Sequence, residues 1–140
     1  MAMSLAGKKI FITGGSRGIG LAIALRAAKD GASIAIAAKT AEENPKLPGT
    51  IFSAAKEIEA AGGTALPIQC DIRDEDAITA AVSKAAEQFG GLDILINNAG
   101  VLINKPFQEL TEIDMTDMFQ ANVLGHFRMI KALLPLLDKK

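Results

Sequence analysis

Cysteine, tyrosine and tryptophan are almost missing from this sequence of 140 residues. It contains one cysteine, six phenylalanines and neither tyrosine nor tryptophan. A single cysteine excludes an internal disulfide framework and a cysteine-rich metal site, and it fits a reducing cytoplasm, where we expect the protein to reside. Cys70 follows an apolar run, which favours an inert core thiol over a nucleophile.

The sequence also lacks an excess of one charge and a long apolar run. Its formal net charge is −1, which gives no bulk attraction to nucleic acid or to an anionic membrane. No apolar run approaches the ~20 residues that a membrane span needs. The first residues do not combine a basic region with an apolar stretch, as a secretory signal does. We expect neither a nucleic-acid partner nor a membrane partner.

Short apolar runs alternate with longer helical patterns along the chain. The runs predict strands at residues 9–13, 33–38, 65–69 and 93–97, and the patterns predict helices near 19–29, 51–61, 78–89 and 111–138. This alternation requires a parallel sheet with helices on both faces and right-handed crossovers. The predicted fold class is α/β, a Rossmann-type doubly wound sheet of strand order 3-2-1-4 that forms one domain over residues 1–140.

The last predicted strand and helix raise the question of what covers them. The strand at 93–97 would be an exposed, very hydrophobic edge, which is an aggregation hazard. The sequence is therefore expected to be the N-terminal portion of a longer protein, or to be covered by another chain. Pro135 should loosen the final turn of the helix. The inner side of this helix is predicted to carry Met115, Met118, Phe119, Val123, Phe127, Ile130, Leu134 and Leu137.

A glycine-rich turn, T-G-G-S-R-G-I-G at residues 13–20, joins the first strand to the first helix. Glycines allow a tight turn and a close approach of an anion to peptide N–H groups, and the helix directs its positive end toward that anion. The alternative is a strand-to-helix turn without a ligand. The position of the turn favours a diphosphate contacted by Gly14, Gly15, Ser16, Arg17, Gly18, Ile19 and Gly20.

Three motifs together resemble the short-chain dehydrogenase/reductase family. They are T-G-x-x-x-G-I-G at 13–20, N-N-A-G at 97–100 and N-V-x-G at 122–125, in family order and at family spacing. The resemblance covers essentially the whole chain, and the segments at 37–40, 45–51 and 57–60 narrow it to one group within the family. It implies a nicotinamide-dependent oxidoreductase that interconverts a carbonyl and a secondary alcohol by hydride transfer.

The end of the second strand discriminates between NADP and NAD. A carboxylate there would bind both hydroxyls of the adenine ribose and repel a 2′-phosphate. The family's acidic position is occupied by Ala38, and its two basic positions are occupied by Lys39 and Arg17. NADP is favoured over NAD, although both cations could be ordinary solvated surface charges. Lys46, in a loop from about 40 to 49, is a further candidate for the 2′-phosphate.

Other cofactor contacts follow from the resemblance. Asp71 would accept from the adenine amino group while Ile72 packs on the ring, unless Asp71 instead caps the helix that begins near Asp74. Asn97 is expected to brace the sheet through its amide. The wall against the riboses of the cofactor is expected to be Asn98, Ala99 and Gly100.

The family catalyses with a Tyr, a Lys four residues later, a Ser and an Asn. Asn122 matches that Asn and falls within the apolar stripe of its helix, where a buried amide needs partners; the alternative is a packing amide. The chain has no tyrosine, and the resemblance places the Ser, Tyr and Lys after Lys140. Lys139 and Lys140 lie too early and are interpreted as surface residues. The chain alone is expected to be inactive.

The remaining polar residues favour structural roles. His126 is expected to pack rather than to catalyse, and the acidic cluster Asp71, Asp74, Glu75 and Asp76 is attributed to helix capping and the helix dipole, so no metal site is predicted. Two other functions remain open. One is a dinucleotide-binding module without catalysis, and the other is an interaction protein that uses its last helix as an interface, as homo-oligomeric members of the family do.

Overall fold

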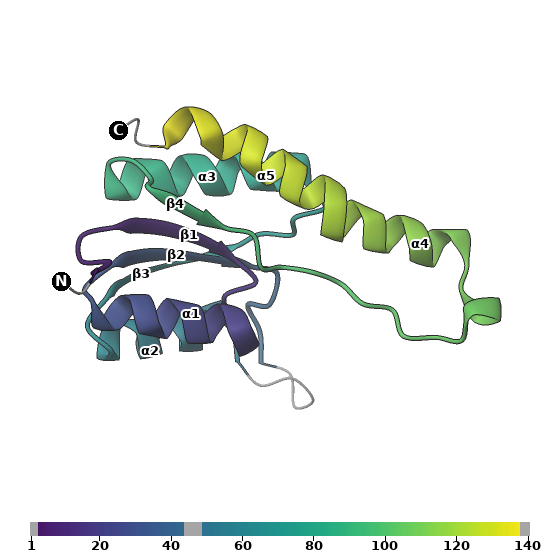
Figure 1. Cartoon of the computed structure of the whole chain (residues 1–140), viewed down its shortest axis with the longest axis horizontal. Coiled ribbons are helices and arrows are strands. Elements are labelled where there is room, and N and C mark those ends of the chain that lie inside the picture. Colours follow the sequence, from purple (N-terminus) through teal and green to yellow (C-terminus); the bar gives the residue numbers. More distant parts are fainter. Residues whose placement is uncertain (1–2, 44–48, 138–140) are drawn as a thin grey trace.

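The computed structural model describes residues 3–43 and 49–137. Four strands alternate with helices along the chain (Figure 1). Their bounds are β1 (Lys9–Thr13), α1 (Gly18–Lys29), β2 (Ser33–Ala38), α2 (Ile51–Ala60), β3 (Thr64–Gln69), α3 (Glu75–Phe89), β4 (Ile94–Ile96), α4 (Glu112–Phe119) and α5 (Gly125–Leu133). No helix among the described residues has the length and apolar character that crossing a membrane would require.

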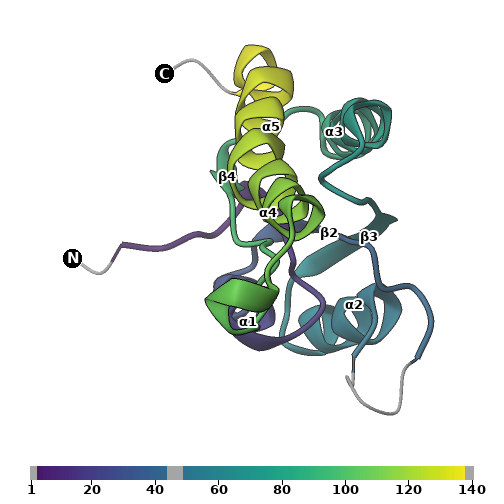
Figure 2. The same ribbon diagram turned by 90° about the vertical axis from the view of Figure 1, so that its right-hand side faces the viewer.

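The strands form one parallel sheet of order β3-β2-β1-β4. Helices α1 and α2 cover one face, and α3 and α5 cover the other (Figures 1 and 2). The predicted α/β fold class and strand order are thereby confirmed. The chain places β2 and β3 on one side of β1 and then returns to place β4 on the other, so the order reverses between β1 and β4.

Two hydrophobic cores result from the alternation of side chains along the central strands. Ile10, Ile12, Ile34 and Ile36 pack under α1 and α2. Phe11 points to the opposite face with Ala35 and Ala37 and meets α3 and α5. All of these side chains are almost completely buried. Burial on both faces explains why the strands read as continuous apolar runs rather than as alternating patterns.

The last helix differs from the prediction. It is interrupted by a π-helical segment, η2 (Gln120–Leu124), and its α-helical part ends at Leu133, two residues before Pro135. Six of the eight side chains predicted to face inward are exposed, namely Met115, Phe119, Val123, Phe127, Ile130 and Leu134. The buried side consists of Ala121, Gly125, Met129 and Leu133. The two apolar sides of this helix were therefore assigned the wrong way round.

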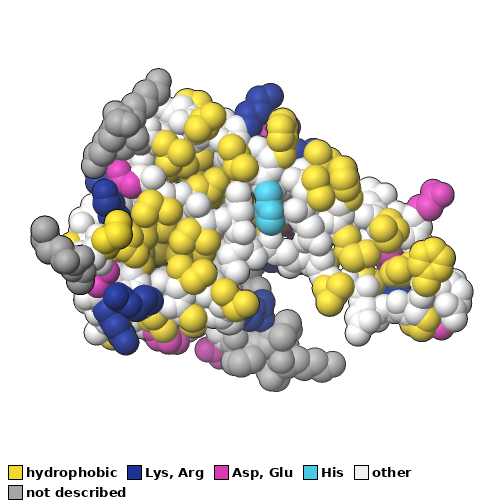
Figure 3. Space-filling model, in the orientation of Figure 1, with side chains coloured by type: hydrophobic (Ala, Val, Ile, Leu, Met, Phe, Trp, Pro, Cys, Tyr) yellow, Lys and Arg dark blue, Asp and Glu magenta, His cyan; other side chains and the backbone are white. Residues whose placement is uncertain are grey.

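Strand β4 is shorter than predicted, with three residues, and pairs with β1 alone in the described sheet. Its residues Ile94, Leu95 and Ile96 are only partly buried. Apolar side chains also gather along α4 and α5 on the face shown in Figure 3. The hydrophobic edge expected from the sequence is thus present, next to an exposed apolar helix face.

Candidate functional site

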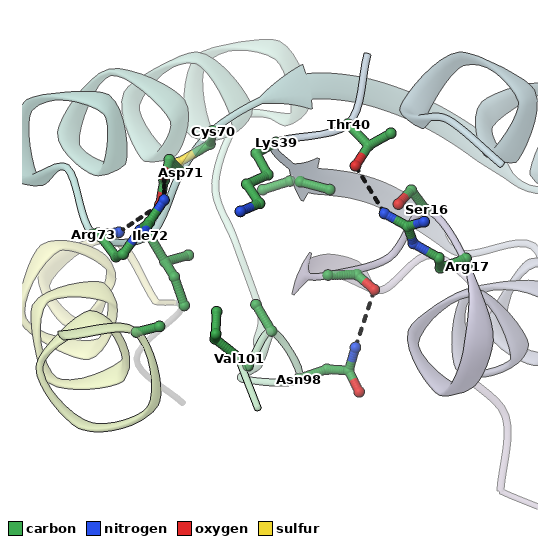
Figure 4. A pocket seen from close by; sticks show the side chains of 16 residues that line it. Ser16, Arg17, Lys39, Thr40, Cys70, Asp71, Ile72, Arg73, Asn98 and Val101 are labelled. Carbon is green, nitrogen blue, oxygen red and sulfur yellow. Dashed lines mark hydrogen bonds and ion pairs between the residues drawn. The ribbon is translucent and has the colours of Figure 1, made fainter. Parts of the chain in front are cut away.

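A cavity of about 290 Å³ opens at the carboxyl ends of the strands (Figure 4). It extends over the ends of all four strands and includes the point between β1 and β4 where the strand order reverses. In open α/β sheets this is the position at which ligands bind. The cavity is lined by Gly14, Ser16, Arg17, Ala37, Ala38, Lys39, Thr40, Cys70, Asp71, Ile72, Arg73, Asn98, Ala99, Gly100, Val101 and Ala121.

The glycine-rich turn provides one wall of the cavity. Gly14 adopts φ +69°, and a Cβ there would lie 2.9 Å from Cα of Ala99 on the opposite wall. Helix α1 begins at Gly18, and its N-cap residue Arg17 makes no side-chain capping bond. Among the described residues no side chain accepts from the first N–H groups of the helix, which can therefore bind an anion.

The predicted loop contacts divide into two groups. Gly14, Ser16 and Arg17 line the cavity, whereas the other four residues do not. Gly15 and Gly20 are buried and permit packing: a Cβ on Gly15 would lie 2.6 Å from Cγ2 of Ile36, and one on Gly20 would overlap the Gly14 carbonyl oxygen. Gly18 and Ile19 lie exposed at the start of α1.

Thr13 and Asn98 join the glycine-rich turn to the end of β4. The buried Thr13 Oγ1 accepts hydrogen bonds from the backbone N–H groups of Asn98 and Ala99, both at 3.0 Å. Asn98 Nδ2 donates to the Gly14 carbonyl at 3.0 Å (Figure 4). The bracing amide is therefore Asn98 rather than Asn97, whose buried Oδ1 has no hydrogen-bond partner in the described part of the chain. Asn98, Ala99 and Gly100 do line the cavity.

Two basic side chains line the cavity, Lys39 after β2 and Arg17 before α1. Lys39 is exposed and extends into the cavity, between Asp71 and Arg17 in the view of Figure 4. Arg17 Nη2 donates to Thr40 Oγ1 at 2.8 Å. The wall between them contains Ala37 and Ala38 and carries no carboxylate. Lys46, the third predicted cation, lies outside the described residues.

Asp71 faces the cavity from the end of β3 and is already paired. Its carboxylate accepts from Arg73 Nη2 at 2.8 Å and from Arg73 Nε at 3.1 Å. The hydrogen bond from Arg73, with smaller help from Lys39, lowers the pKa of Asp71. The helix is capped by Asp74, which accepts from the N–H groups of Asp76 and Ala77. Asp74, and not Asp71, is therefore the residue that caps α3.

Ile72 and Cys70 form the apolar part of this wall. Both side chains are buried and border the cavity. Burial raises the pKa of the Cys70 thiol to about 11, and the carboxylates of Asp71 and Asp74 add to the effect. A thiol that stays protonated at neutral pH is a poor nucleophile, in keeping with the structural role expected for Cys70.

Asn122 lies in the π-helical segment, which is a common feature of functional sites. Its Nδ2 donates to the Val101 carbonyl at 2.8 Å, and its Oδ1 accepts from the Val101 N–H at 2.7 Å. The residue is exposed rather than buried, so the expected burial was wrong. Its amide nevertheless has both partners and fixes the segment that follows β4.

Replacing Asn122 with alanine is expected to lower the free energy of unfolding by about 1 kcal/mol, because two exposed side chain–backbone hydrogen bonds are lost. Urea unfolding measures this change, and hydrogen exchange at the Val101 N–H should become faster. Asn104→Ala, at an exposed position in the same connection, is the matched control. Unchanged exchange at Val101 would show that the amide does not hold this segment.

His126 contacts the backbone of Ala99, a residue that lines the cavity. Its Nε2 lies 2.6 Å from the carbonyl oxygen of Ala99, and the ring is half-buried. This contact agrees with the packing role expected for the histidine. Within residues 3–43 and 49–137, no three His, Cys, Asp or Glu side chains gather into a group able to hold a metal ion.

Sequence reasoning missed four residues of the site. Thr13 belongs to the glycine-rich motif, so its place in that motif was a usable signal. Thr40, Arg73 and Val101 carry no such signal, because they contribute through hydrogen bonds to Arg17, Asp71 and Asn122 that no sequence motif marks. Only the folded arrangement brings them to the cavity.

Comparisons with known proteins agree with this geometry. The short chain dehydrogenase family model matches residues 8–140. Hydroxysteroid dehydrogenase-like protein 2 from Bos taurus is 56% identical over 137 residues, which are 96% of this chain and 32% of that protein. The narrower likeness expected from the segments at 37–40, 45–51 and 57–60 was to this group, and it is confirmed.

Solved structures give the same result. A short chain dehydrogenase from Mycobacterium thermoresistibile is 52% identical with a TM-score of 0.93, and the match covers 98% of this chain and 49% of that one. An NADH-dependent reductase complexed with NAD is 28% identical with a TM-score of 0.82, over 94% of this chain and 52% of that one. The chain spans about half the length of these structures and about a third of the Bos taurus protein.

Proposed function

The chain belongs to the short-chain dehydrogenase family, and we propose that it is the part of an oxidoreductase that binds NADP(H). The observation that carries this proposal is the N-terminus of α1, which has no side-chain cap among the described residues and directly follows Ser16 and Arg17 of the cavity wall. Peptide N–H groups without an acceptor, next to a residue without a Cβ, suit a diphosphate. Such a dinucleotide supplies or accepts the hydride in the reaction of the whole enzyme.

The residues present fit the rest of a dinucleotide. Asp71 and Ile72 would hold the adenine, since one presents acceptor oxygens and the other an apolar surface. Asn98, Ala99 and Gly100 would contact the riboses from the opposite wall. The relative complexed with NAD supports a nicotinamide dinucleotide as the ligand, while the choice between NADP and NAD depends on this chain's own side chains.

The proposed preference for NADP rests on charge at the end of β2. A 2′-phosphate carries nearly two negative charges, which Lys39 and Arg17 would neutralise. Ala38 stands where a carboxylate would repel it. These features favour NADP(H), whereas a chain adapted to NAD would present an acceptor to the ribose hydroxyls.

Asn122 is proposed to support proton transfer in the whole enzyme, which would act on a small-molecule carbonyl or secondary alcohol. This chain contains no tyrosine, so the acid/base group of the family must come from elsewhere. We therefore propose that the 140 residues alone bind the coenzyme but do not turn over substrate.

Titration of the chain with NADPH and NADH tests the proposed function. We expect saturable binding of both by calorimetry, with NADPH bound at least about tenfold more tightly, because one charge-assisted contact contributes about 1.5–3 kcal/mol. Equal affinities would contradict the preference for NADP. A folded sample that binds neither coenzyme would refute the proposed function itself.

A second function, subunit association, is favoured by the exposed apolar face of the last helix. Phe119, Val123, Phe127 and Ile130 are each about half exposed. Contiguous exposed apolar side chains of this kind mark interaction surfaces. A chain that self-associates but binds neither coenzyme would support an interaction module instead of the dinucleotide site.

A further inference from the structure

The side chain of Arg17 is held in place by Thr40. Arg17 Nη2 donates to Thr40 Oγ1 at 2.8 Å at one edge of the cavity (Figure 4). The two residues come from different connections, since Arg17 precedes α1 and Thr40 follows β2. The hydrogen bond therefore fixes a long, otherwise adaptable side chain against a second part of the fold.

Thr40 is itself well anchored. Its carbonyl accepts from the N–H of Ile51 at 3.1 Å, so its backbone is bonded to the first residue of α2. That helix is capped by Thr50, whose Oγ1 accepts from the Ser53 N–H at 3.1 Å. Because the Thr40 backbone is held in this way, its hydroxyl can restrict the position of the Arg17 guanidinium.

Gly49, which directly precedes the capping residue Thr50, lies close to the glycine-rich turn. Gly49 adopts φ +102°, and a Cβ there would lie 2.8 Å from the carbonyl oxygen of Ser16. The connection after β2 thus leaves and returns next to the turn that contains Arg17. Thr40 and Gly49 together fix the relative placement of the two loops at the cavity mouth.

One nitrogen of the guanidinium remains without a partner. Arg17 Nη1 is shielded from solvent and makes no hydrogen bond within the described part of the chain. A shielded N–H donor without an acceptor is costly, and an anionic oxygen would satisfy it. Lys39 differs, because its exposed ammonium is a flexible point charge. Arg17 is the cation whose orientation the fold controls.

We propose that Thr40 is a specificity-determining positioning residue, which holds the Arg17 guanidinium so that it recognises the 2′-phosphate of NADP(H). This inference rests on the proposed function and deepens it. Thr40 acts through Arg17, so removing its hydroxyl should weaken NADPH binding and leave NADH binding unchanged. A residue that merely stabilised the loop would affect both coenzymes equally.

The test compares Thr40→Val, which keeps the shape and removes the hydroxyl, with Thr40→Ser, which keeps the hydroxyl. We expect Thr40→Val to raise the Kd for NADPH about fivefold to tenfold and the Kd for NADH by less than about twofold. Thr40→Ser should remain close to wild type. Thr79→Val, which removes a hydroxyl bonded within α3, is the matched control and should change neither Kd.

A double-mutant cycle identifies the route of the effect. In an Arg17→Met background, which itself should weaken NADPH binding more strongly, Thr40→Val should cost less than about another twofold. Two outcomes would overturn only the role proposed for Thr40. One is that the losses of NADPH affinity from Thr40→Val and Arg17→Met are additive, and the other is that Thr40→Val weakens the binding of both coenzymes equally. A wild-type chain that binds neither coenzyme, or binds both equally, would overturn the proposed function or its NADP preference together with this inference.

Discussion

Valine in place of Gly14 is expected to abolish measurable binding of both NADPH and NADH, a loss of at least about 100-fold at about 1.4 kcal/mol per factor of ten. Gly14 adopts φ +69°, which a β-branched residue tolerates poorly. The added Cβ would also lie 2.9 Å from Cα of Ala99 and 3.0 Å from Nδ2 of Asn98. The two walls of the cavity would be forced apart where the diphosphate is proposed to lie.

Backbone strain alone could destabilise this variant, so a strain-matched control is needed. Gly7 has almost the same conformation, φ +73°, but a Cβ there meets no atom within 4 Å. Gly7→Val should therefore lose stability while keeping its affinity for the coenzymes. Calorimetric titration and circular dichroism of both variants separate the two effects. Retained affinity in Gly14→Val would place the ligand somewhere other than this turn.

Most of the fold could be predicted from the sequence because the central strands are buried on both faces. Runs such as 9–13 and 33–38 are continuously apolar, and only a covered parallel sheet makes that pattern favourable. Strand order then follows from right-handed crossovers and short connections. The remaining differences at β3 and β4 concern single residues at strand ends.

The last helix could not be predicted in the same way, because it is apolar on two sides. Large residues such as Phe119 and Phe127 have the spacing of a core stripe, yet the buried side includes Gly125. A Cβ on Gly125 would lie 2.9 Å from the carbonyl oxygen of Ile72. The inner side is thus selected by close approach to the loop after β3, a distance that side-chain periodicity does not encode. The π-helical segment shifts the period further.

The candidate site likewise contains residues that could be identified from the sequence and residues that could not. Residues within the motifs, such as Gly14 and Asn98, could be identified because the backbone geometry they provide is local. The bracing role was assigned to Asn97 instead of Asn98, because β4 ends at Ile96 and strand alternation no longer applies to either residue. Thr40 acts through a side-chain contact between two loops, and Arg73 acts through its pair with Asp71 two residues away; no pattern in the sequence predicted either contact.

Replacing Lys39 with aspartate should reverse the preference between the two coenzymes. The ratio of the Kd values for NADPH and NADH is expected to shift toward NADH by on the order of 100-fold, because the variant loses an attractive charge and gains a repulsive one. The new carboxylate can also accept from the ribose hydroxyls of NADH. Lys39 lies in the cavity and Ala38 beside it brings no charge, so one substitution changes the sign at this position.

The neighbouring carboxylate responds to the same change. Lys39 contributes to the low pKa of Asp71, so that pKa should rise in Lys39→Asp, although the pair with Arg73 keeps it below its usual value. Adenine recognition by ionised Asp71 should therefore persist at neutral pH, and NADH should still bind. Lys84→Asp, the same charge change at an exposed position on α3, controls for net charge. If both variants shift the ratio equally, the effect is long-range electrostatics and Lys39 does not contact the 2′-phosphate; if neither shifts it, the preference is not determined by charge at this end of β2.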